Sequence, residues 1–271
     1  MRTLLKIGFG LLVLAVVMIA LLFSMLRAKG TTTYNINERH VLSSETRTVS
    51  AEVTEIDLSG PIDLTLRQGA IASMKVSGEK RFLENVGTTQ SGNSLSIGPR
   101  GMLLHHKHPL QVTLTLPSLD KLELRGSGDS EVNGFSGDKV EVQLSGSGSL
   151  KFNGRYKDVV AGVSGSGDME MNGGDRSDKV DVTLAGSGRL TVVGQCKKFK
   201  AELVGSGDLE AEHLAAPVAD VTLSGSGTLV VQAQRSVLVN LKGSGDVTVL
   251  GNPSERVINK TGAGEVNFRD D

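Results

Sequence analysis

Aromatic residues and cysteine are scarce in this sequence, and neither sign of charge dominates it. The 271 residues include 7 Phe, 2 Tyr and no Trp, which argues against a thick globular core. The single cysteine, Cys196, excludes an intrachain disulfide framework and a cysteine-rich zinc site. The 29 basic and 30 acidic side chains leave a net charge of −1, so no overall field attracts nucleic acid. A hydrophobic content of 38% excludes a disordered chain, and only 6 Pro without a G-X-Y period exclude collagen.

A long apolar run lies near the N-terminus. Residues 7–26 contain no charged side chain, and as a helix they would span about 30 Å, the thickness of the hydrocarbon core of a bilayer. A cleaved signal peptide is the alternative, but no A-x-A-like cleavage site follows the run. We therefore predict an uncleaved transmembrane signal anchor over residues 1–29, a polar linker over 30–50, and export of the rest of the chain.

A motif of small residues recurs eight times in residues 119–268. It reads Gly-Ser-Gly seven times and Gly-Ala-Gly once, and successive first glycines are 18 to 21 residues apart. Two glycines around a small residue permit positive φ and close backbone approach, as a sharp turn stacked on its neighbours requires. The predicted turn residues are Gly126, Gly128, Gly146, Gly148, Gly165, Gly167, Gly186, Gly188, Gly205, Gly207, Gly225, Gly227, Gly243, Gly245, Gly262 and Gly264.

Aliphatic and polar side chains alternate on both sides of each turn. The position two before the first glycine is aliphatic in seven copies, as at Leu144, Val163 and Leu184, and becomes Lys260 in the last. A period of two indicates strands with one face inward, and a single unit cannot bury that face alone. We predict an all-β fold, a single parallel β-helix (β-solenoid) over residues 51–268. A meander of β-hairpins is the alternative.

The residue after each turn distinguishes coils of about 20 residues from coils of about 40. In chain order it is Asp129, Ser149, Asp168, Arg189, Asp208, Thr228, Asp246 and Glu265. In the shorter coil an uncharged or basic residue separates successive aspartates, whereas the longer coil would stack like charges about 4.8 Å apart. We therefore expect coils of about 20 residues, less regular first coils upstream, and a solvated last edge at Lys260.

The sequence resembles a known family. The apolar N-terminal run, IDLSGPIDLTLRQG at 56–69, PSLDKLELRGSGD at 117–129 and the eight turns together resemble the auto-transporter adhesin family with a head GIN domain, over roughly residues 50–268. The resemblance implies a parallel β-helix similar in shape to pectin lyases, a role in cell adhesion, and no catalytic residues.

Two sets of residues are candidates for ion binding. The aspartates after the turns suggest calcium, but calcium-binding β-rolls repeat every nine residues and alternate turns here lack the carboxylate. A phosphate-cradling loop would need a helix after the glycines, and strands follow them instead. His105, His106 and His108 could converge on a metal, although no carboxylate neighbours them. We predict solvated side chains at both places, and neither metal nor cofactor.

Two further sets are candidates for catalysis. Lys197 and Lys198 could lower the pKa of Cys196, but the sequence offers no neighbouring histidine and His213 lies in another loop, so we expect an inert thiol. A polysaccharide-cleaving reaction would need clustered carboxylates, for which Asp57 and Asp63 are candidates only by default.

The sequence therefore predicts a non-catalytic adhesin of the bacterial cell envelope. We expect it to be anchored in the inner membrane, with the β-helix in the periplasm or at the cell surface, and to bind a cell-surface protein or glycan by many weak contacts along the repeat. A homo-oligomer is left open. The alternatives are a periplasmic envelope scaffold, active for instance in stress responses, and a polysaccharide lyase.

Overall fold

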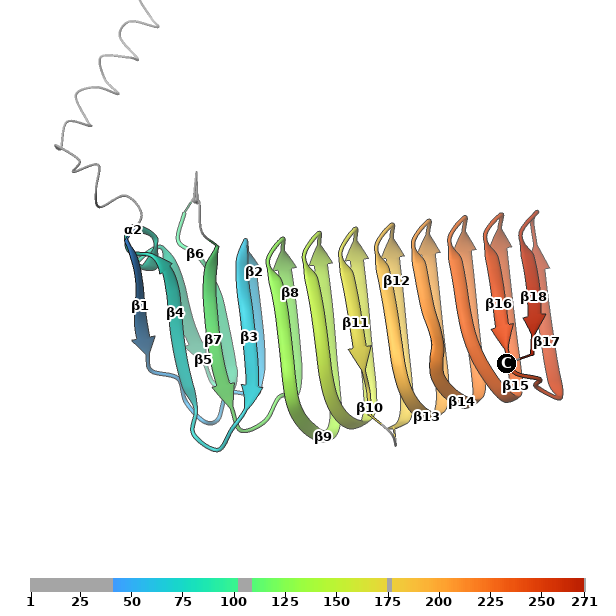
Figure 1. Ribbon diagram of the computed structural model, residues 1–271, viewed down its shortest axis with the longest axis horizontal. Coiled ribbons are helices and arrows are strands. Elements are labelled where there is room, and N and C mark those ends of the chain that lie inside the picture. The colour runs from blue at the N-terminus through green and yellow to red at the C-terminus, as the bar shows by residue number, and fades with distance from the viewer. Residues whose placement is uncertain (1–40, 102–108, 175–176, 271) are drawn as a thin grey trace, which may run out of the picture. The chain divides into compact units, whose positions relative to one another are not determined.

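The protein is built of β-strands wound into stacked coils (Figure 1). The computed structural model describes residues 41–101, 109–174 and 177–270. The less regular first part contains β1 (Leu42–Arg47), β2 (Glu55–Gly60), β3 (Ile62–Gln68), β4 (Ser73–Glu79), the one-turn helix α2 (Lys80–Leu83), β5 (Val86–Ser91), β6 (Ser94–Pro99), β7 (Leu110–Leu116) and β8 (Lys121–Gly126). The regular part contains β9 (Asp129–Gly146), β10 (Ser149–Gly165), β11 (Asp168–Asn172), β12 (Ser177–Gly186), β13 (Arg189–Gly205), β14 (Asp208–Gly225), β15 (Thr228–Gly243), β16 (Asp246–Leu250), β17 (Glu255–Thr261) and β18 (Glu265–Arg269).

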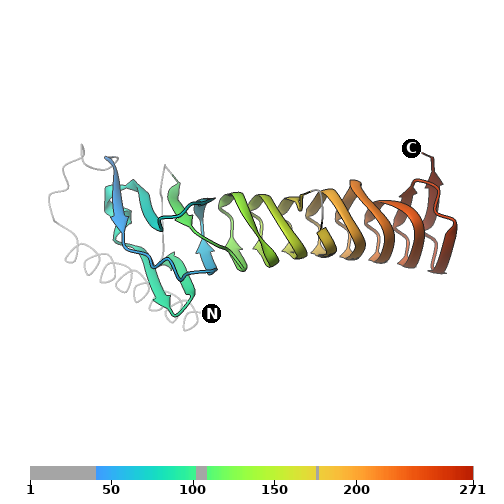
Figure 2. The same cartoon turned by 90° about the horizontal axis from the view of Figure 1, so that it is seen from below.

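Successive coils of the regular part pair in parallel. Leu144 pairs with Val163, and Val163 with Leu184, so one coil takes about 20 residues. Each coil follows one layer to a sharp corner and returns along the other layer, and Figure 2 shows the coils following one another in single file. The predicted β-solenoid with coils of about 20 residues is confirmed, and the hairpin meander and the coil of about 40 residues are excluded.

The core consists of aliphatic columns between the two layers. The column two residues before each corner is at most 4% exposed; its members are Leu124, Leu144, Val163, Leu184, Leu203, Leu223 and Leu241. The columns four residues before and six residues after the corner are buried in the same way, as at Val182 and Val192. Full burial stabilises the fold by about 1.5–3 kcal/mol for each Leu or Val side chain, which is why the units stack.

The first coils do not follow the order of the chain. β2 pairs in parallel with both β6 and β8, and β3 with both β7 and β9. The coil formed by β2 and β3 therefore lies between the coil of β6 and β7, which comes later in the sequence, and the coil that begins with β8.

Antiparallel pairs cover the N-terminal end of the stack. β1 pairs with β4, β4 with β7, and β5 with β6. The expectation of less regular first coils is right, but these pairs mean that the fold is not purely parallel. They arise because antiparallel neighbours need only a short connection, as at Gly92-Asn93 between β5 and β6. β1 also lies within the stretch predicted as a linker, so the folded part begins earlier than residue 51.

The last coil ends in an open, polar edge. The inward positions of β17 hold Arg256, Ile258 and Lys260, opposite the buried Val237, Val239 and Leu241 of β15. Ile258 is 44% exposed, and the Arg256 guanidinium lies 4.2 Å from the centre of the Phe268 ring. Charged side chains thus replace the aliphatic columns where the stack ends, as the sequence led us to expect.

In the described part of the chain, no helix has both the length and the apolar character needed to cross a membrane. The span predicted over residues 7–26 lies outside the described residues, as do residues 30–40 of the predicted linker.

Candidate functional site

The sixteen predicted turn glycines lie in one row of stacked corners, at the top of Figure 1. The first glycine of each pair has a positive φ, which is 135° at Gly186. The second glycine lies against the coil before it: a Cβ on Gly188 would stand 2.0 Å from the carbonyl oxygen of Gly167. The first glycine is therefore required for its conformation and for close packing, and the second for close packing alone. Both roles are structural.

A ladder of polar side chains begins directly after each corner. Asp168 pairs with Arg189, and Arg189 with Asp208. The backbone N–H of Arg189 donates to Asp168 Oδ1 at 3.2 Å, and its Nη2 lies 3.5 Å from Asp208 Oδ2. The predicted separation of like charges holds along these coils. It fails at the last step, where Asp246 faces Glu265 and accepts a hydrogen bond from the Glu265 backbone N–H at 3.1 Å.

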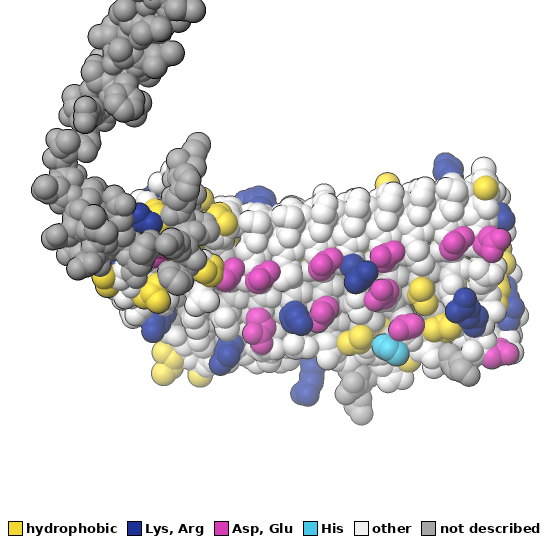
Figure 3. Space-filling model, turned by 45° about the horizontal axis from the view of Figure 1, so that its top comes forward, with side chains coloured by type: hydrophobic (Ala, Val, Ile, Leu, Met, Phe, Trp, Pro, Cys, Tyr) yellow, Lys and Arg dark blue, Asp and Glu magenta, His cyan; other side chains and the backbone are white. Residues whose placement is uncertain are grey.

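The outward side chains of the strands that follow the corners form a surface that we call the acidic face. Its carboxylates belong to Asp63, Asp129, Glu131, Asp168, Glu170, Asp208, Glu210, Glu212, Asp246 and Glu265, and its cations to Arg67, Lys151, Arg189 and Arg269. Figure 3 shows the acidic side chains in rows along the stack. This face favours a neutral or cationic partner and disfavours a densely charged polyanion.

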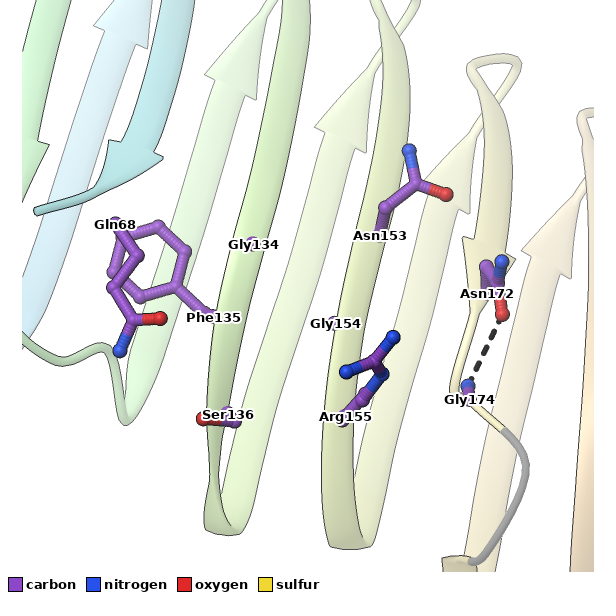
Figure 4. A pocket seen from close by; sticks show the side chains of 9 residues that line it. All are labelled: Gln68, Gly134, Phe135, Ser136, Asn153, Gly154, Arg155, Asn172 and Gly174. Atoms are coloured by element: carbon purple, nitrogen blue, oxygen red, sulfur yellow. Dashed lines mark hydrogen bonds between the residues drawn. The ribbon is translucent and has the colours of Figure 1, made fainter.

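A groove lies at the lower end of the acidic face, where the coils bend into the other layer (Figure 4). It has a volume of about 500 Å³. Its described lining consists of Gln68, Gly134, Phe135, Ser136, Asn153, Gly154, Arg155, Asn172 and Gly174. We call it the amide groove, because three of its side chains are carboxamides. The ladder register shifts between Asn153 and Gly154, and such a bulge re-aims the side chains beside it.

Hydrogen bonds fix the amide orientations in the groove. Asn153 Nδ2 donates to Asn133 Oδ1 at 3.0 Å, and Asn133 Nδ2 donates to Glu131 Oε1 at 2.7 Å. Gln68 Nε2 donates to the carbonyl oxygen of Pro117 at 3.0 Å, and Asn172 Oδ1 accepts from Gly174 N at 3.1 Å. Asn153 and Gln68 therefore keep free acceptor oxygens, and Asn172 keeps a free donor nitrogen, with respect to the described residues.

The sequence reasoning missed two structural features that carry recognisable signals. The dipeptide Asn-Gly recurs at 133–134, 153–154 and 172–173, with the period of the corners, and it marks the bend beside the amide groove. Gly60, with φ of 91°, forms a further corner, because it pairs with Gly126. The large separation of these two glycines along the chain hid that corner from a search at 20-residue spacing.

Cys196 is buried, and this overturns the idea that neighbouring lysines could lower its pKa. It lies within β13 rather than in a loop and is 3% exposed. Burial raises the pKa of the thiol to about 12, and Lys197 pairs instead with Asp178, Nζ to Oδ1, at 2.5 Å. His213 also lies within a strand, β14, where its exposed ring is 3.4 Å from a Glu212 carboxylate oxygen. The thiol is thus held protonated, as an inert thiol would be.

The remaining candidates do not assemble into a catalytic or metal centre among the described residues. Asp57 on β2 forms an ion pair with Arg125, whereas Asp63 follows the corner onto the acidic face, so the two carboxylates lie on different layers. Glu123, beside Asp57 on the neighbouring strand, has its pKa lowered by a hydrogen bond from Lys121, the opposite of what a general acid needs. No group of three or more His, Cys, Asp or Glu in the described ranges is placed to hold a metal. His105, His106 and His108 lie outside those ranges.

The family described as "Putative auto-transporter adhesin, head GIN domain" matches residues 52–176 and 174–253. The chain belongs to this family. No curated protein matches it.

Solved structures share the fold of this family member. A "putative adhesin" from Parabacteroides distasonis has 23% identity and a TM-score of 0.79, with 84% of this chain and 97% of that chain covered. One from Parabacteroides merdae has 17% identity and a TM-score of 0.79, with 84% and 96% covered. A "Putative lipid binding protein" from Parabacteroides distasonis has 20% identity and a TM-score of 0.74, with the same coverage of 84% and 96%. At these identities the likeness concerns the fold alone.

Proposed function

We propose that this protein is a non-catalytic adhesin of the bacterial cell envelope that binds a surface glycan through the acidic face and the groove at its lower end. The observation that carries the proposal is the regular exposure of polar side chains, one coil after another, along a continuous stack of strands. Strand spacing repeats equivalent side chains about every 4.8 Å, so an extended polymer can make many weak contacts in succession.

The family and the fold of the solved relatives support a binding role rather than a catalytic one. The carboxylates of the acidic face lie in rows, where several pair with cations, such as Glu170 with Lys151 at 3.3 Å and Glu210 with Arg189 at 3.5 Å. Paired carboxylates across a cleft would be the signature of glycan cleavage, and rows on a convex sheet surface suit reversible contact.

We also propose that residues 7–26 anchor the protein in the inner membrane and that the β-solenoid is exported. The apolar length of this run supports the proposal. Surface proteolysis of intact cells, compared with proteolysis of cells with a permeabilised outer membrane, locates the β-solenoid. Resistance to protease after permeabilisation would place it in the cytoplasm and contradict export.

The adhesion proposal is tested by shortening the stack by one coil. Deletion of residues 187–205 joins Gly186 to Ser206 and preserves both the corner motif and the strand register. We expect the full chain to bind immobilised envelope polysaccharide, and the deletion variant to bind it more weakly because it offers fewer contacts. Unchanged binding after the deletion, or no binding by the full chain, would contradict the proposal.

A matched pair of charge variants tests which layer binds. One variant replaces Asp168, Glu170, Asp208 and Glu210 on the acidic face with Ser or Thr, and the control makes the same replacements at Glu141, Asp181, Glu202 and Asp220 on the opposite layer. Only the first variant should change binding to the immobilised polysaccharide. An equal change in both would show that a general surface charge is responsible.

A further inference from the structure

We propose that the amide groove binds a saccharide unit that carries a single carboxylate, with Arg155 as the residue that pairs with that carboxylate. This inference rests on the proposed function and assigns one ligand class to one part of the surface. Arg155 is the only charged residue among the described residues that line the groove. It makes no ion pair or hydrogen bond with another described residue, so its guanidinium is available to a ligand.

The other polar groups of the groove suit sugar hydroxyls. A hydroxyl both donates and accepts, and the groove offers acceptors on Asn153 and Gln68, a donor on Asn172, and the hydroxyl of Ser136. Figure 4 shows these side chains coming from successive coils, so they line a path across the stack. A volume of about 500 Å³ is within the usual range for small-molecule sites and accommodates a short saccharide.

A peptide suits the groove less well than a saccharide. Peptide recognition relies on large apolar or aromatic anchors that fill pockets. The one aromatic residue of the described lining, Phe135, is 1% exposed and belongs to the core. The accessible part of the groove is therefore formed by amides, a hydroxyl, a guanidinium and the backbone of three glycines.

The charges around the groove limit how many charges its ligand can carry. Planar guanidinium matches a carboxylate with two parallel hydrogen bonds. Glu131 and Glu170 stand on the same coils, one beside Asn133 and the other paired with Lys151. A polymer with a charge on every sugar would meet these carboxylates, whereas a carboxylate set among neutral sugars meets only Arg155.

Hyaluronan hexasaccharide, in which uronic acids alternate with neutral sugars, is a suitable probe. Its carboxyl-reduced form is the matched neutral ligand, and polygalacturonate is the densely charged one. We expect calorimetry to show that the wild-type protein binds the hexasaccharide about ten- to a hundredfold more tightly than the reduced form, as a charge-assisted pair predicts. Polygalacturonate oligomers of equal length should bind more weakly than the hexasaccharide.

Arg155→Gln should abolish this preference for the carboxylate and leave the affinity for the reduced form nearly unchanged. Arg189→Gln is the matched control, because Arg189 is an exposed arginine of the same face outside the groove; it should keep the preference. Thermal unfolding of both variants checks that the fold is intact. A wild-type protein that does not bind the hexasaccharide, or binds it no better than the reduced form, overturns the assignment, as does a preference that survives Arg155→Gln.

Binding to immobilised envelope polysaccharide separates this inference from the adhesion proposal. If the wild type and Arg155→Gln bind that polysaccharide equally and the hexasaccharide shows no preference, the groove assignment is wrong and the adhesin function stands. If the wild type binds no envelope polysaccharide but the carboxylate preference in the groove depends on Arg155, the groove assignment stands and the adhesin function is wrong.

Discussion

Gly188→Ala would place a methyl group where the backbone of the preceding coil already stands. The new Cβ would lie 2.0 Å from the carbonyl oxygen of Gly167, so the corner must open. Three hydrogen bonds between coils cross this corner: Ser187 N and Gly188 N donate to Gly165 O at 2.9 and 3.2 Å, and Arg189 N donates to Gly167 O at 3.2 Å.

The expected loss follows from those contacts. Weakening three backbone hydrogen bonds, each with a net contribution of about 0.5–1.5 kcal/mol, lowers the free energy of unfolding by about 2–4 kcal/mol. The range agrees with the cost of overpacking a close-packed interior, about 1–3 kcal/mol. Equilibrium unfolding in guanidinium chloride, followed by circular dichroism, measures the change.

A local measurement and a matched control make this prediction decisive. Because a solenoid opens coil by coil, hydrogen exchange should accelerate at amides 187–189 more than at the distant corner at 243–246. The control is Gly173→Ala, where φ is not positive and the nearest atom to a Cβ would be 3.5 Å away. If Gly188→Ala destabilises the protein no more than Gly173→Ala does, close packing of the corners is refuted.

Three further predictions concern the core, the thiol and the open edge. Leu184→Ala should lower the free energy of unfolding by about 2–5 kcal/mol through the cavity it leaves, whereas Thr183→Ala on the outer surface should change it by less than about 0.5 kcal/mol; equal losses in denaturant unfolding would contradict the column model of the core. Burial raises the pKa of Cys196 from 9.0 to about 12, so its contribution to stability is complete below pH 9 and is lost as the pH rises toward 12; thermal unfolding at pH 8 and pH 10 should show a steeper alkaline decline for the wild type than for Cys196→Ala, and parallel declines would refute a buried thiol. Lys260→Leu should extend an apolar column to the exposed edge and promote self-association in sedimentation velocity, and a variant as monodisperse as the wild type would show that Lys260 does not protect this edge.

Periodicity was sufficient to establish the regular part of the fold. The glycine pairs at 18- to 21-residue spacing, with aliphatic side chains alternating around them, admit few arrangements other than stacked coils. The order Asp168, Arg189, Asp208 predicted the coil length, because only the shorter coil keeps the like charges apart. These conclusions depend on local rules that act identically in each repeat.

The amide groove could be found only in part from the sequence. The Asn-Gly dipeptides mark the bend, but Gln68 reaches the groove from a coil whose neighbours in space are distant in the chain. No local pattern indicates that Arg155 lacks a partner among the described residues while Lys151 and Arg189 are paired, since pairing depends on which strands lie side by side.

Sequence alone determined that the chain coils, how long each coil is, which side chains face inward and where the corners bend, because the repeat imposes the same backbone and packing constraints every 20 residues or so. Tertiary structure decided the order of the first coils, in which β2 and β3 lie between strands that come later in the chain. It also decided the antiparallel strands that cover them and the surroundings of Cys196 and Arg155. These features depend on contacts between segments far apart in the chain, and no repeat period encodes such contacts.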